Sequence, residues 1–534
     1  MIYSFLLKLI KNNSRFFHYC LGGGLAFLVD LSLLYIFTEY LHLWYIWSAT
    51  LSFLITAVVN YTIQKYWTFK NDSRQIFRQL TIFVIIQVIG LILNNIFLYC
   101  LVEFVDLWYI LAKIIAAGLV LIWNFSAGKT FVFNVSEAGI LIAGEIFPPT
   151  IGGPATYTHR LAHYFLSHQI DFSLVYYAHS PLLAADHALT PFASAVNAKR
   201  PLPWRYLVYF FRLFFCSIHA KVIYAQGPVA SGWPALLVSR LLGKKLVVKI
   251  VGDYAWEQAQ LNHATLLGID DWQKNPEPES KNYFFNKKIS LLNKLERRVV
   301  RRADCVVVPS HYLKKIVLGW GADQSKVKVI YNSISLKNNP GLSSSVAQDK
   351  INIHGDLLLT VARLLPWKGV AMLIEIMPEL LKFNPSFKLV VVGNGPDEDR
   401  LHHLAAEKKL TNAVIFPGRI SQDDLPDYYQ AASIFILNSG YEGLSHSIID
   451  AMNYNLPVVA SAIGGNPELI DDDYNGLLAE YNNHSAWVAA IKRLWQSEKL
   501  RTRLVASPLT KLTALSFDNM ITETLKIINN FNSH

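Results

Sequence analysis

Four long apolar runs with almost no charge occupy the first quarter of the chain. They are residues 16–38, 43–64, 79–102 and 107–128. The only Asp, Glu, Lys or Arg residues inside them are Asp30 and Lys113. Each run reaches the roughly 20 residues that a helix needs to cross the hydrocarbon core of a bilayer. The pattern predicts four transmembrane helices, which form a membrane domain over residues 1–134.

The basic residues around these runs predict their orientation. Bases precede the first run and surround the connection between the second and the third: Lys8, Lys11, Arg15, Lys65, Lys70, Arg74 and Arg78. The other two connections carry acids and His42 but no Lys or Arg. By the positive-inside rule, both termini and everything after the fourth run are expected in the cytoplasm, with the chain in the cytoplasmic membrane.

This membrane segment repeats itself after 64 positions. The tetrapeptide LWYI at 43–46 recurs at 107–110. The pattern N-[YF]-x3-K-x-[WF]-x-F begins at Asn60 and again at Asn124. Two helices per repeat predict that the two copies run in the same direction through the membrane, as in transporters built from parallel repeats.

Several polar residues of this segment are candidates for binding a lipid phosphate. Those expected near the cytoplasmic ends of the second and fourth helices are Asn60, Lys65, Asn124 and Lys129. They either hold a phosphate or act as helix-end caps and snorkelling lysines. Asp30 and Lys113 lie where a charge is unfavourable, which indicates either a functional role or a mutual pair.

From residue 138 onward, short apolar runs alternate with helical stretches, which is typical of parallel, doubly wound sheets. The expected strands are residues 139–143, 174–177, 221–225, 245–251, 305–309, 327–331, 357–361, 388–392, 414–416, 434–437 and 457–460. A polar linker at 337–349 separates them into two α/β domains with a cleft between them. We expect these domains at 138–336 and 350–515, and a C-terminal helix at 516–534 that returns to the first of them.

Composition and charge limit the partners. The chain is 52 % hydrophobic and only 16 % charged, which excludes disorder and implies a membrane part. The net charge is +10, and its basic excess is concentrated in residues 137–334. That excess favours anionic lipid head groups or phosphorylated ligands, whereas no nucleic-acid-binding motif accompanies it. The four cysteines lie far apart, so neither a zinc site nor a disulfide framework is indicated.

Two groups of residues in the second α/β domain suggest a site for a diphosphate. Arg363 and Lys368 follow its first expected strand, where ligands bind in such folds, and are placed to clamp a diphosphate. Gly393 and Gly395 follow the next strand, in a turn that lets a ligand approach the backbone.

Residues 438–461 form the most informative stretch, because a strand leads through a loop of small residues into a helix. The free amides of that helix N-terminus are expected to face the cleft. Glu442 lies in the loop. The other residues expected to bind a donor here are Gly443, Leu444, Ser445 and Asp450. Carboxylates suit the hydroxyls of a sugar and a ribose, and bases and amides suit the phosphates between them.

The first α/β domain is expected to hold the acceptor. Gly152 and Gly153 open a helix after the first strand and are candidates for a phosphate or acceptor loop. Asp253 either orients an acceptor hydroxyl or caps a turn. The apolar segment 204–215 carries two arginines and is either an internal helix or a segment that dips into the bilayer interface.

The repeated motif and the glycines at 22–24 resemble the GtrA-like family over residues 14–134. This resemblance implies a module that handles polyprenyl-phosphate-linked sugars. Residues 139–530 resemble a retaining glycosyltransferase of family 4 with the GT-B fold. Its E-x7-E signature is matched by Glu442 and, with a shorter side chain, by Asp450; its R-x4-K pair is matched by Arg363 and Lys368; its G-G loop by Gly152 and Gly153.

The second resemblance implies that Glu442 contacts the donor sugar, Asp450 the ribose, and Arg363 with Lys368 the diphosphate. It also implies retention of the anomeric configuration, with the leaving phosphate accepting the acceptor's proton. Because Arg and Lys supply positive charge, no metal or other cofactor is expected. The acidic triplet at 471–473 resembles a metal motif, although a solvated turn is the favoured interpretation.

These observations predict a membrane-anchored glycosyltransferase that moves a sugar from a nucleotide-diphosphate donor to an acceptor, expected to be lipid-linked, at the cytoplasmic face. The four helices would hold or translocate a polyprenyl-phosphate-linked product. Two alternatives remain: a translocase of lipid-linked sugar whose cytosolic part only binds cargo, and a helical segment that only anchors the chain or makes it a homodimer.

Overall fold

The structure is a computed structural model. It describes residues 14–69, 76–105, 107–128, 132, 139–148, 150, 153–178, 187–218, 220–333, 343–506 and 515–531. The chain divides into two units. One is Met1–Gly139 with Phe211–Lys221 and Leu237–Lys244, and the other comprises the remaining residues.

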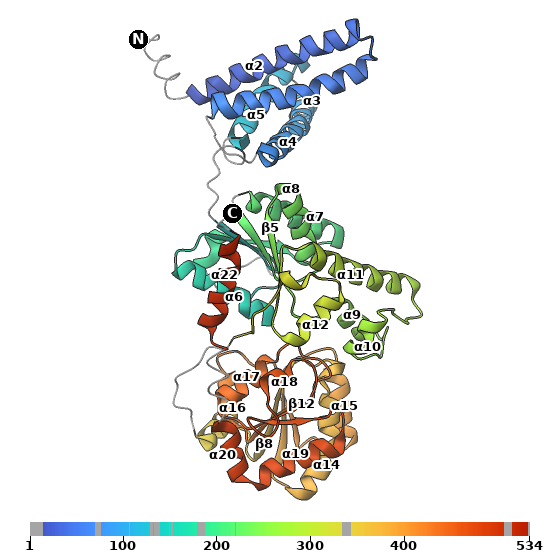
Figure 1. Cartoon of the computed structure of the whole chain (residues 1–534), viewed down its shortest axis with the longest axis vertical. Coiled ribbons are helices and arrows are strands. Elements are labelled where there is room, and N and C mark those ends of the chain that lie inside the picture. The colour runs from blue at the N-terminus through green and yellow to red at the C-terminus, as the bar shows by residue number, and fades with distance from the viewer. Residues whose placement is uncertain are drawn as a thin grey trace. The chain divides into compact units, whose positions relative to one another are not determined.

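The N-terminal part of the chain is helical (Figure 1). Its helices are α2 (Ser14–Tyr35), which continues as the π-helical turn η1 (Ile36–Tyr40), α3 (Tyr45–Ile63), which continues as η2 (Gln64–Thr68), α4 (Ile76–Glu103) and α5 (Tyr109–Ala127). Helix α2 packs along α3, and α4 packs along α5. The predicted repeat is visible in this arrangement, because α3 and α5 have 19 residues each and begin directly after Trp44 and Trp108. Those two tryptophans also have nearly equal ψ angles, 130° and 126°.

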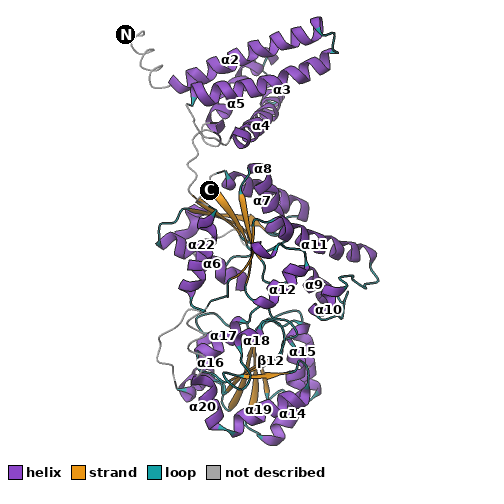
Figure 2. Ribbon diagram, in the orientation of Figure 1, coloured by secondary structure: helices purple, strands orange, loops and turns teal. Residues whose placement is uncertain are grey.

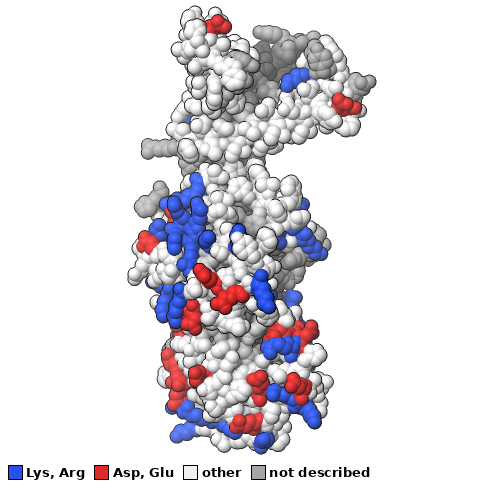
Figure 3. Space-filling view, turned by 90° about the vertical axis from the view of Figure 1, so that its right-hand side faces the viewer, with Lys and Arg blue, Asp and Glu red and all other residues white. Residues whose placement is uncertain are grey.

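Among the described residues, two helical stretches are long and apolar enough to cross a membrane, namely His18–Tyr40 and Gln79–Glu103. Leu111–Ala127 is a shorter apolar helix. By this measure the expected count of four spans stays a prediction. Large apolar side chains on these helices are exposed, for example Trp47 and Ile114 at 61 % and 64 %. Figure 3 shows few charged residues on the helical part at the top and many over the α/β domains. An apolar surface of this extent agrees with helices that face lipid.

The first α/β domain contains a seven-stranded sheet in the order β3-β2-β1-β4-β5-β6-β7. Its strands are β1 (Gly139–Ala143), β2 (Phe172–Ala178), β3 (Ala193–Asn197), β4 (Ala220–Ala225), β5 (Lys245–Lys249), β6 (Cys305–Val308) and β7 (Val327–Val329). The second contains a six-stranded, fully parallel sheet in the order β10-β9-β8-β11-β12-β13. Its strands are β8 (Asp356–Val361), β9 (Phe387–Val392), β10 (Val414–Gly418), β11 (Ile434–Leu437), β12 (Val458–Ser461) and β13 (Leu477–Ala479).

Helices flank both sheets (Figure 2). Those of the first domain are α6 (Gly153–Ser167), η4 (His187–Phe192), α7 (Leu202–Ser217), α8 (Gly232–Leu242), α9 (Tyr254–Leu261), α10 (Ile269–Lys274), α11 (Tyr283–Arg302), α12 (His311–Gly319) and η5 (Gln324–Lys326). Those after the linker are α13 (Ser344–Ile351), η6 (Pro366–Lys368), α14 (Val370–Phe383), α15 (Glu398–Glu407), α16 (Leu425–Ala431), α17 (His446–Asn453), α18 (Asn466–Leu469), α19 (His484–Gln496), α20 (Glu498–Ala506) and α22 (Phe517–Asn530).

The pattern of apolar runs did not predict two of the strands. β3 contains only one fully apolar buried residue, Val196, and β13 spans three residues after an acidic turn. Both lie at the edge of their sheets, where a strand has one neighbour. β3 is missed because it is mostly half-buried, and β13 because it is too short to show a pattern. In the other direction, the expected strand at 245–251 ends early, at Lys249.

Buried apolar clusters cover the strands from both sides in the second domain, as expected for a doubly wound sheet. The core of the first domain also includes Met520, Ile521 and Ile528 of α22. After the second α/β domain, the chain therefore returns, and its C-terminal helix packs in the core of the first α/β domain.

A carboxylate from the second domain links the two α/β domains. The Glu468 carboxylate accepts hydrogen bonds from the backbone N–H groups of His311 (2.9 Å) and Tyr312 (2.7 Å) at the start of α12. The hydroxyl of Tyr331 donates to the same carboxylate at 3.1 Å. Burial, and then the Glu468 charge, raise the pKa of Tyr331 to about 12. A carboxylate at a helix N-terminus is favoured by the free amides and by the helix dipole.

Neutralising this carboxylate tests the link between the domains. We expect Glu468→Gln to speed hydrogen exchange of the amides at 311–313 by about tenfold, because charge-assisted hydrogen bonds are replaced by weaker ones. Hydrogen exchange with mass spectrometry on the full chain measures this rate. Glu480→Gln, at an exposed helix cap of the same domain, serves as the control. Equal exchange at 311–313 in both variants would mean that the link adds nothing.

Candidate functional site

Arg363 and Lys368 lie just beyond the carboxyl end of β8. Arg363 is exposed, and Lys368 closes the short turn η6. The turn ends at Gly369, whose φ of +59° lies in the left-handed region that favours glycine. A Cβ at Gly369 would also collide with Asn438, which precedes the Glu442 loop. The turn therefore brings Lys368 against that loop.

The structure joins Lys368 and Glu442. Their Nζ and Oε1 atoms are 2.5 Å apart, and the two side chains are 15 % and 13 % exposed. The loop around Glu442 is fixed by its backbone: the N–H of Gly440 donates to the Trp367 carbonyl at 2.6 Å, and the N–H of Gly465 donates to the Glu442 carbonyl at 2.8 Å. Two loops from neighbouring strands thus hold a cation and a carboxylate together at one edge of the sheet.

The candidate glycines are required by protein neighbours. A Cβ at Gly393, which has a φ of +134°, would collide with the Ala362 carbonyl, and one at Gly395 would collide with that of Leu364. Gly443 faces the first domain, where its Cβ would lie 2.7 Å from the Val251 carbonyl oxygen. The sequence predicted close approach of a ligand, and the structure shows close approach of other backbone segments.

The remaining donor candidates lie at the start of α17 and along it. Leu444 is buried, and Ser445 caps the helix by accepting a hydrogen bond from the Ile448 N–H at 3.3 Å. Asp450 lies beside Tyr429 and Tyr454: burial, and then the Asp450 charge, raise the pKa of both tyrosines.

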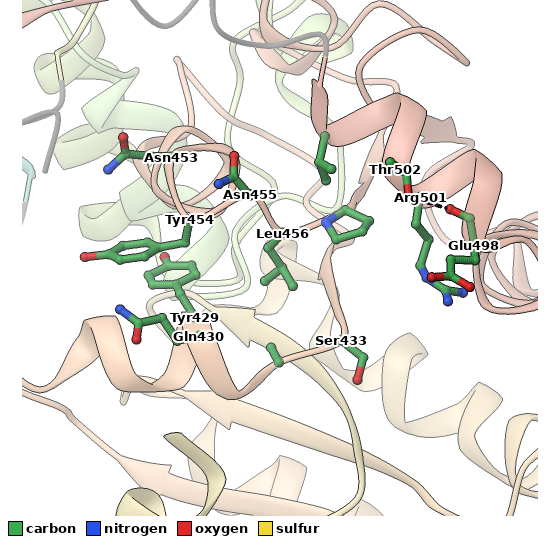
Figure 4. Close-up of a pocket in the computed structure, with 13 residues that line it drawn as sticks. Tyr429, Gln430, Ser433, Asn453, Tyr454, Asn455, Leu456, Glu498, Arg501 and Thr502 are labelled. Carbon is green, nitrogen blue, oxygen red and sulfur yellow. Dashed lines mark hydrogen bonds between the residues drawn. The ribbon is translucent and has the colours of Figure 1, made fainter. Parts of the chain in front are cut away.

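These two tyrosines stack with ring centroids 5.5 Å apart and line a pocket with Glu498 and Arg501 of α20 (Figure 4). Ser433 and Leu456, which line it too, precede β11 and β12. The pocket therefore lies at the amino ends of these strands, whereas Glu442 follows a carboxyl end. It is a separate hollow from the site predicted by the motifs.

On the acceptor side, the structure decides between the two interpretations of Asp253. Its Oδ1 accepts a hydrogen bond from the Trp256 N–H at 2.8 Å, and its Oδ2 accepts one from Gln273 at 2.7 Å. Asp253 is thus the N-cap of α9, and both oxygens are engaged within the protein. Gly152 lies outside the described residues. Gly153 begins α6, and a Cβ there would lie 3.5 Å from the His446 ring.

Two further carboxyl groups of the first domain were not singled out by the motifs. Burial, and then the charge of Asp253, raise the pKa of Glu257 to about 7, although Lys368 and Arg363 lower it. Burial also raises the pKa of Glu145 to about 7, against hydrogen bonds from Ser231. Glu257 therefore lies within electrostatic reach of the predicted phosphate clamp.

Sequence reasoning also passed over Lys249 and His446. Lys249 is the last residue of β5, whose three central residues are apolar, and is only 2 % exposed. His446 is the first residue of α17. A signal for Lys249 was present, because a charged residue at the carboxyl end of a parallel strand is a ligand candidate in this kind of fold. His446 had no such signal, since only the approach of the two domains places it near Gly153.

Among the membrane candidates, Asn60 accepts a hydrogen bond from Gln64 at 3.2 Å and Asn124 donates one to Gln87 at 3.2 Å. Lys65 is buried, with its ammonium 5.4 Å from the centre of the Tyr66 ring. Lys129 lies outside the described residues.

The suggested pair of Asp30 and Lys113 is not formed. Oδ1 of Asp30 is buried without a hydrogen-bond partner, and Lys113 is exposed on α5. Among the described residues these two side chains make no ion pair, so pairing does not explain their presence in apolar helices.

Three family models match the chain in succession. Residues 18–133 match the GtrA/DPMS transmembrane domain, 151–338 match Glycosyltransferase Family 4, and 346–507 match Glycosyl transferases group 1. The matched boundaries follow the helical part and the two α/β domains of the structure.

Curated relatives match part of the chain. A D-inositol 3-phosphate glycosyltransferase from Nocardioides is 28 % identical over 43 % of this chain and 55 % of its own length. An enzyme of the same name from Acidothermus cellulolyticus is 26 % identical over 69 % of this chain and 84 % of its own. The lipopolysaccharide core biosynthesis glycosyltransferase LpsE from Rhizobium meliloti is 28 % identical over 41 % and 62 %. The chain thus spans little more than half the length of several relatives that it matches.

Solved structures show the same fold. Sucrose-phosphate synthase from Thermosynechococcus elongatus superposes with a TM-score of 0.61 at 19 % identity, over 74 % of this chain and all of its own. HepE from Anabaena, solved with UDP and glucose, gives 0.59 at 17 % identity over 74 % of this chain and all of its own. The two Rossmann-like domains form a GT-B fold. The chain is a fusion of a GtrA/DPMS transmembrane domain with the two domains of a family 4, group 1 glycosyltransferase.

Proposed function

We propose that this protein is a membrane-bound, retaining glycosyltransferase. It moves a sugar from a nucleotide-diphosphate donor to a lipid-linked acceptor, such as a polyprenyl-phosphate-linked glycan, at the cytoplasmic face during cell-surface glycan synthesis. The observation that carries this proposal is the ion pair of Lys368 with Glu442, next to Arg363 at the carboxyl edge of the second sheet.

The charges at this edge suit cleavage of a sugar–diphosphate bond. Negative charge grows on the leaving diphosphate as the bond breaks, and Arg363 and Lys368 are placed to stabilise it. A bound diphosphate competes with Glu442 for the Lys368 ammonium. Its arrival therefore frees the Glu442 carboxylate to accept hydrogen bonds from the donor sugar. Because two cations supply the positive charge, we propose a reaction without a metal ion.

The other roles follow from the family resemblance. Asp450 is assigned to the ribose, and the leaving phosphate accepts the proton of the acceptor hydroxyl while the anomeric configuration is retained. The solved structure of HepE with UDP and glucose supports a nucleotide-sugar donor. The name of LpsE, which acts in lipopolysaccharide core synthesis, supports a cell-surface glycan as product.

Removing the proposed phosphate clamp tests the enzymatic assignment. We expect Arg363→Ala to lower sugar transfer by about 100-fold, as loss of one group that stabilises a developing anion does. Glu442→Gln should lower it as well, because an amide is a weaker acceptor for sugar hydroxyls. The assay is transfer of radiolabelled sugar from nucleotide sugars to extracted membrane lipid.

Arg493→Ala is the matched control for this assay. Arg493 is half exposed and paired with Asp473 on the surface of the same domain, at 2.7 Å. Its loss should leave transfer unchanged. Undiminished transfer in both Arg363→Ala and Glu442→Gln would refute the assignment and favour the alternative, a translocase whose cytosolic part only binds cargo.

We further propose that α2 to α5 all span the membrane, with both termini in the cytoplasm, and that this domain holds the lipid-linked substrate and brings two copies together. Its exposed apolar surface and its match to the GtrA/DPMS domain support this arrangement. Asn60 and Lys65 lie at the end of α3 that adjoins the basic connection, where a lipid phosphate is expected.

Reporter fusions test this topology. Alkaline phosphatase, which is active only outside the cytoplasm, should be active when fused after residue 42 or 105 and inactive after residue 72. The reason is the preference of basic connections for the cytoplasmic side. A cytoplasmic reporter such as green fluorescent protein at the same positions provides the reciprocal control. An active phosphatase fusion after residue 72 would reverse the proposed orientation.

A further inference from the structure

Lys249 is a buried cation without a counter-charge. It is the last residue of β5 and is 2 % exposed. It therefore lies at the carboxyl edge of the first sheet, where the acceptor candidates are expected. Among the described residues no ion pair or hydrogen bond engages its ammonium. Its contact is with an aromatic face, since Nζ lies 3.4 Å from the centre of the Tyr157 ring. A ring face compensates an ammonium only in part for the loss of water.

The groups around Lys249 are basic or neutral. Tyr157 belongs to the first turns of α6, which begins at Gly153. His446 of the second α/β domain lies beside Gly153, because a Cβ added at Gly153 would be 3.5 Å from the His446 ring. The charges of Lys249 and Arg160 both act on His446. These residues therefore lie near the N-terminal end of α6, and among the described residues neither Lys249 nor His446 forms an ion pair with an Asp or Glu.

This arrangement is unfavourable until an anion arrives. Burial lowers the pKa of Lys249 to about 7, which expresses the cost of an unpaired ammonium. Burial, and then the charges of Lys249 and Arg160, lower the pKa of His446 to about 4, so that its ring is neutral near pH 7. The N-terminus of a helix of 15 residues adds free N–H groups and the positive end of its dipole.

We propose that Lys249, His446 and the N-terminus of α6 bind a phosphoryl group. The site rests on the proposed function, because both proposed substrates carry phosphate: the donor through its diphosphate, and the acceptor through the phosphate that joins glycan to lipid. An ammonium, an imidazole N–H and helix amides from different directions suit the several oxygens of a phosphate. Since Lys249 and α6 belong to one domain and His446 to the other, a phosphate here joins the two domains.

The stability of the protein without ligand provides the first test. Lys249→Met keeps the length of the side chain and its contact with Tyr157 but removes the unpaired charge. We expect its melting temperature in lipid nanodiscs to equal or exceed that of the wild type. The control is Lys245→Met at the opposite end of β5, where the lysine is half exposed and paired with Asp304 at 3.2 Å. A purely structural role predicts the opposite result, a clear fall in melting temperature for Lys249→Met.

Ligand binding provides the second test and identifies the source of the phosphate. Full-length protein in nanodiscs is titrated with UDP as the donor probe and with polyprenyl monophosphate as the acceptor probe. We expect Lys249→Met to weaken binding of at least one probe by tenfold or more, while Lys245→Met binds both like the wild type. Loss of UDP binding alone assigns the site to the donor, and loss of polyprenyl phosphate binding alone assigns it to the acceptor.

Unchanged binding of both probes by Lys249→Met overturns the proposal. Failure of this proposal and failure of the proposed function give different results. If the wild type binds polyprenyl phosphate through Lys249 but transfers no sugar from any nucleotide sugar, the phosphoryl site stands and the enzymatic assignment falls. If transfer depends on Arg363 while Lys249→Met binds both probes normally, the enzymatic assignment stands and the site falls.

Discussion

The ion pair between Lys368 and Glu442 is the interaction on which the rest of the site depends. It joins the turn after β8 to the loop after β11, two strands that are neighbours in the sheet although their loops lie 74 residues apart. Both side chains are largely buried, so each charge stabilises the other in place of water. The ion pair thus holds the two loops together at the edge where the proposed diphosphate and sugar would bind.

Several buried groups of the first α/β domain carry unfavourable charges. Lys249 has no acidic partner among the described residues, and burial raises the pKa values of Glu145 and Glu257 to about 7. Such groups destabilise the unliganded protein and are retained where binding or chemistry uses them. The link from Glu468 to α12 supplies compensation, since it holds the domains together with hydrogen bonds to a charged acceptor.

The fusion of a membrane domain with a glycosyltransferase fold has a physical rationale. The proposed lipid-linked acceptor would be confined to the bilayer, so an enzyme attached to the same surface would meet it at a high effective concentration. Helices α3 and α5 have the same length, and each begins directly after a tryptophan. This agreement indicates that the membrane domain is built from two copies of one unit. Among the described residues of this domain, Oδ1 of Asp30 is buried without a hydrogen-bond partner, which keeps Asp30 a functional candidate.

The sequence by itself determined the order of the domains, the central strands of both sheets and the repeat, and it singled out Arg363, Lys368 and Glu442 as site candidates. Apolar periodicity and strand-end motifs are local properties, so they can be recognised along the chain. The sequence did not reveal the edge strands β3 and β13, because β3 has only one buried residue and β13 is only three residues long. Only the tertiary structure showed that Asp253 is a helix cap, that Gly443 is required by the neighbouring domain, and that Lys249 and His446 meet at α6. Those roles depend on which segments of the two α/β domains approach each other. The spacing of residues along the chain does not show which distant segments bury or pair one another.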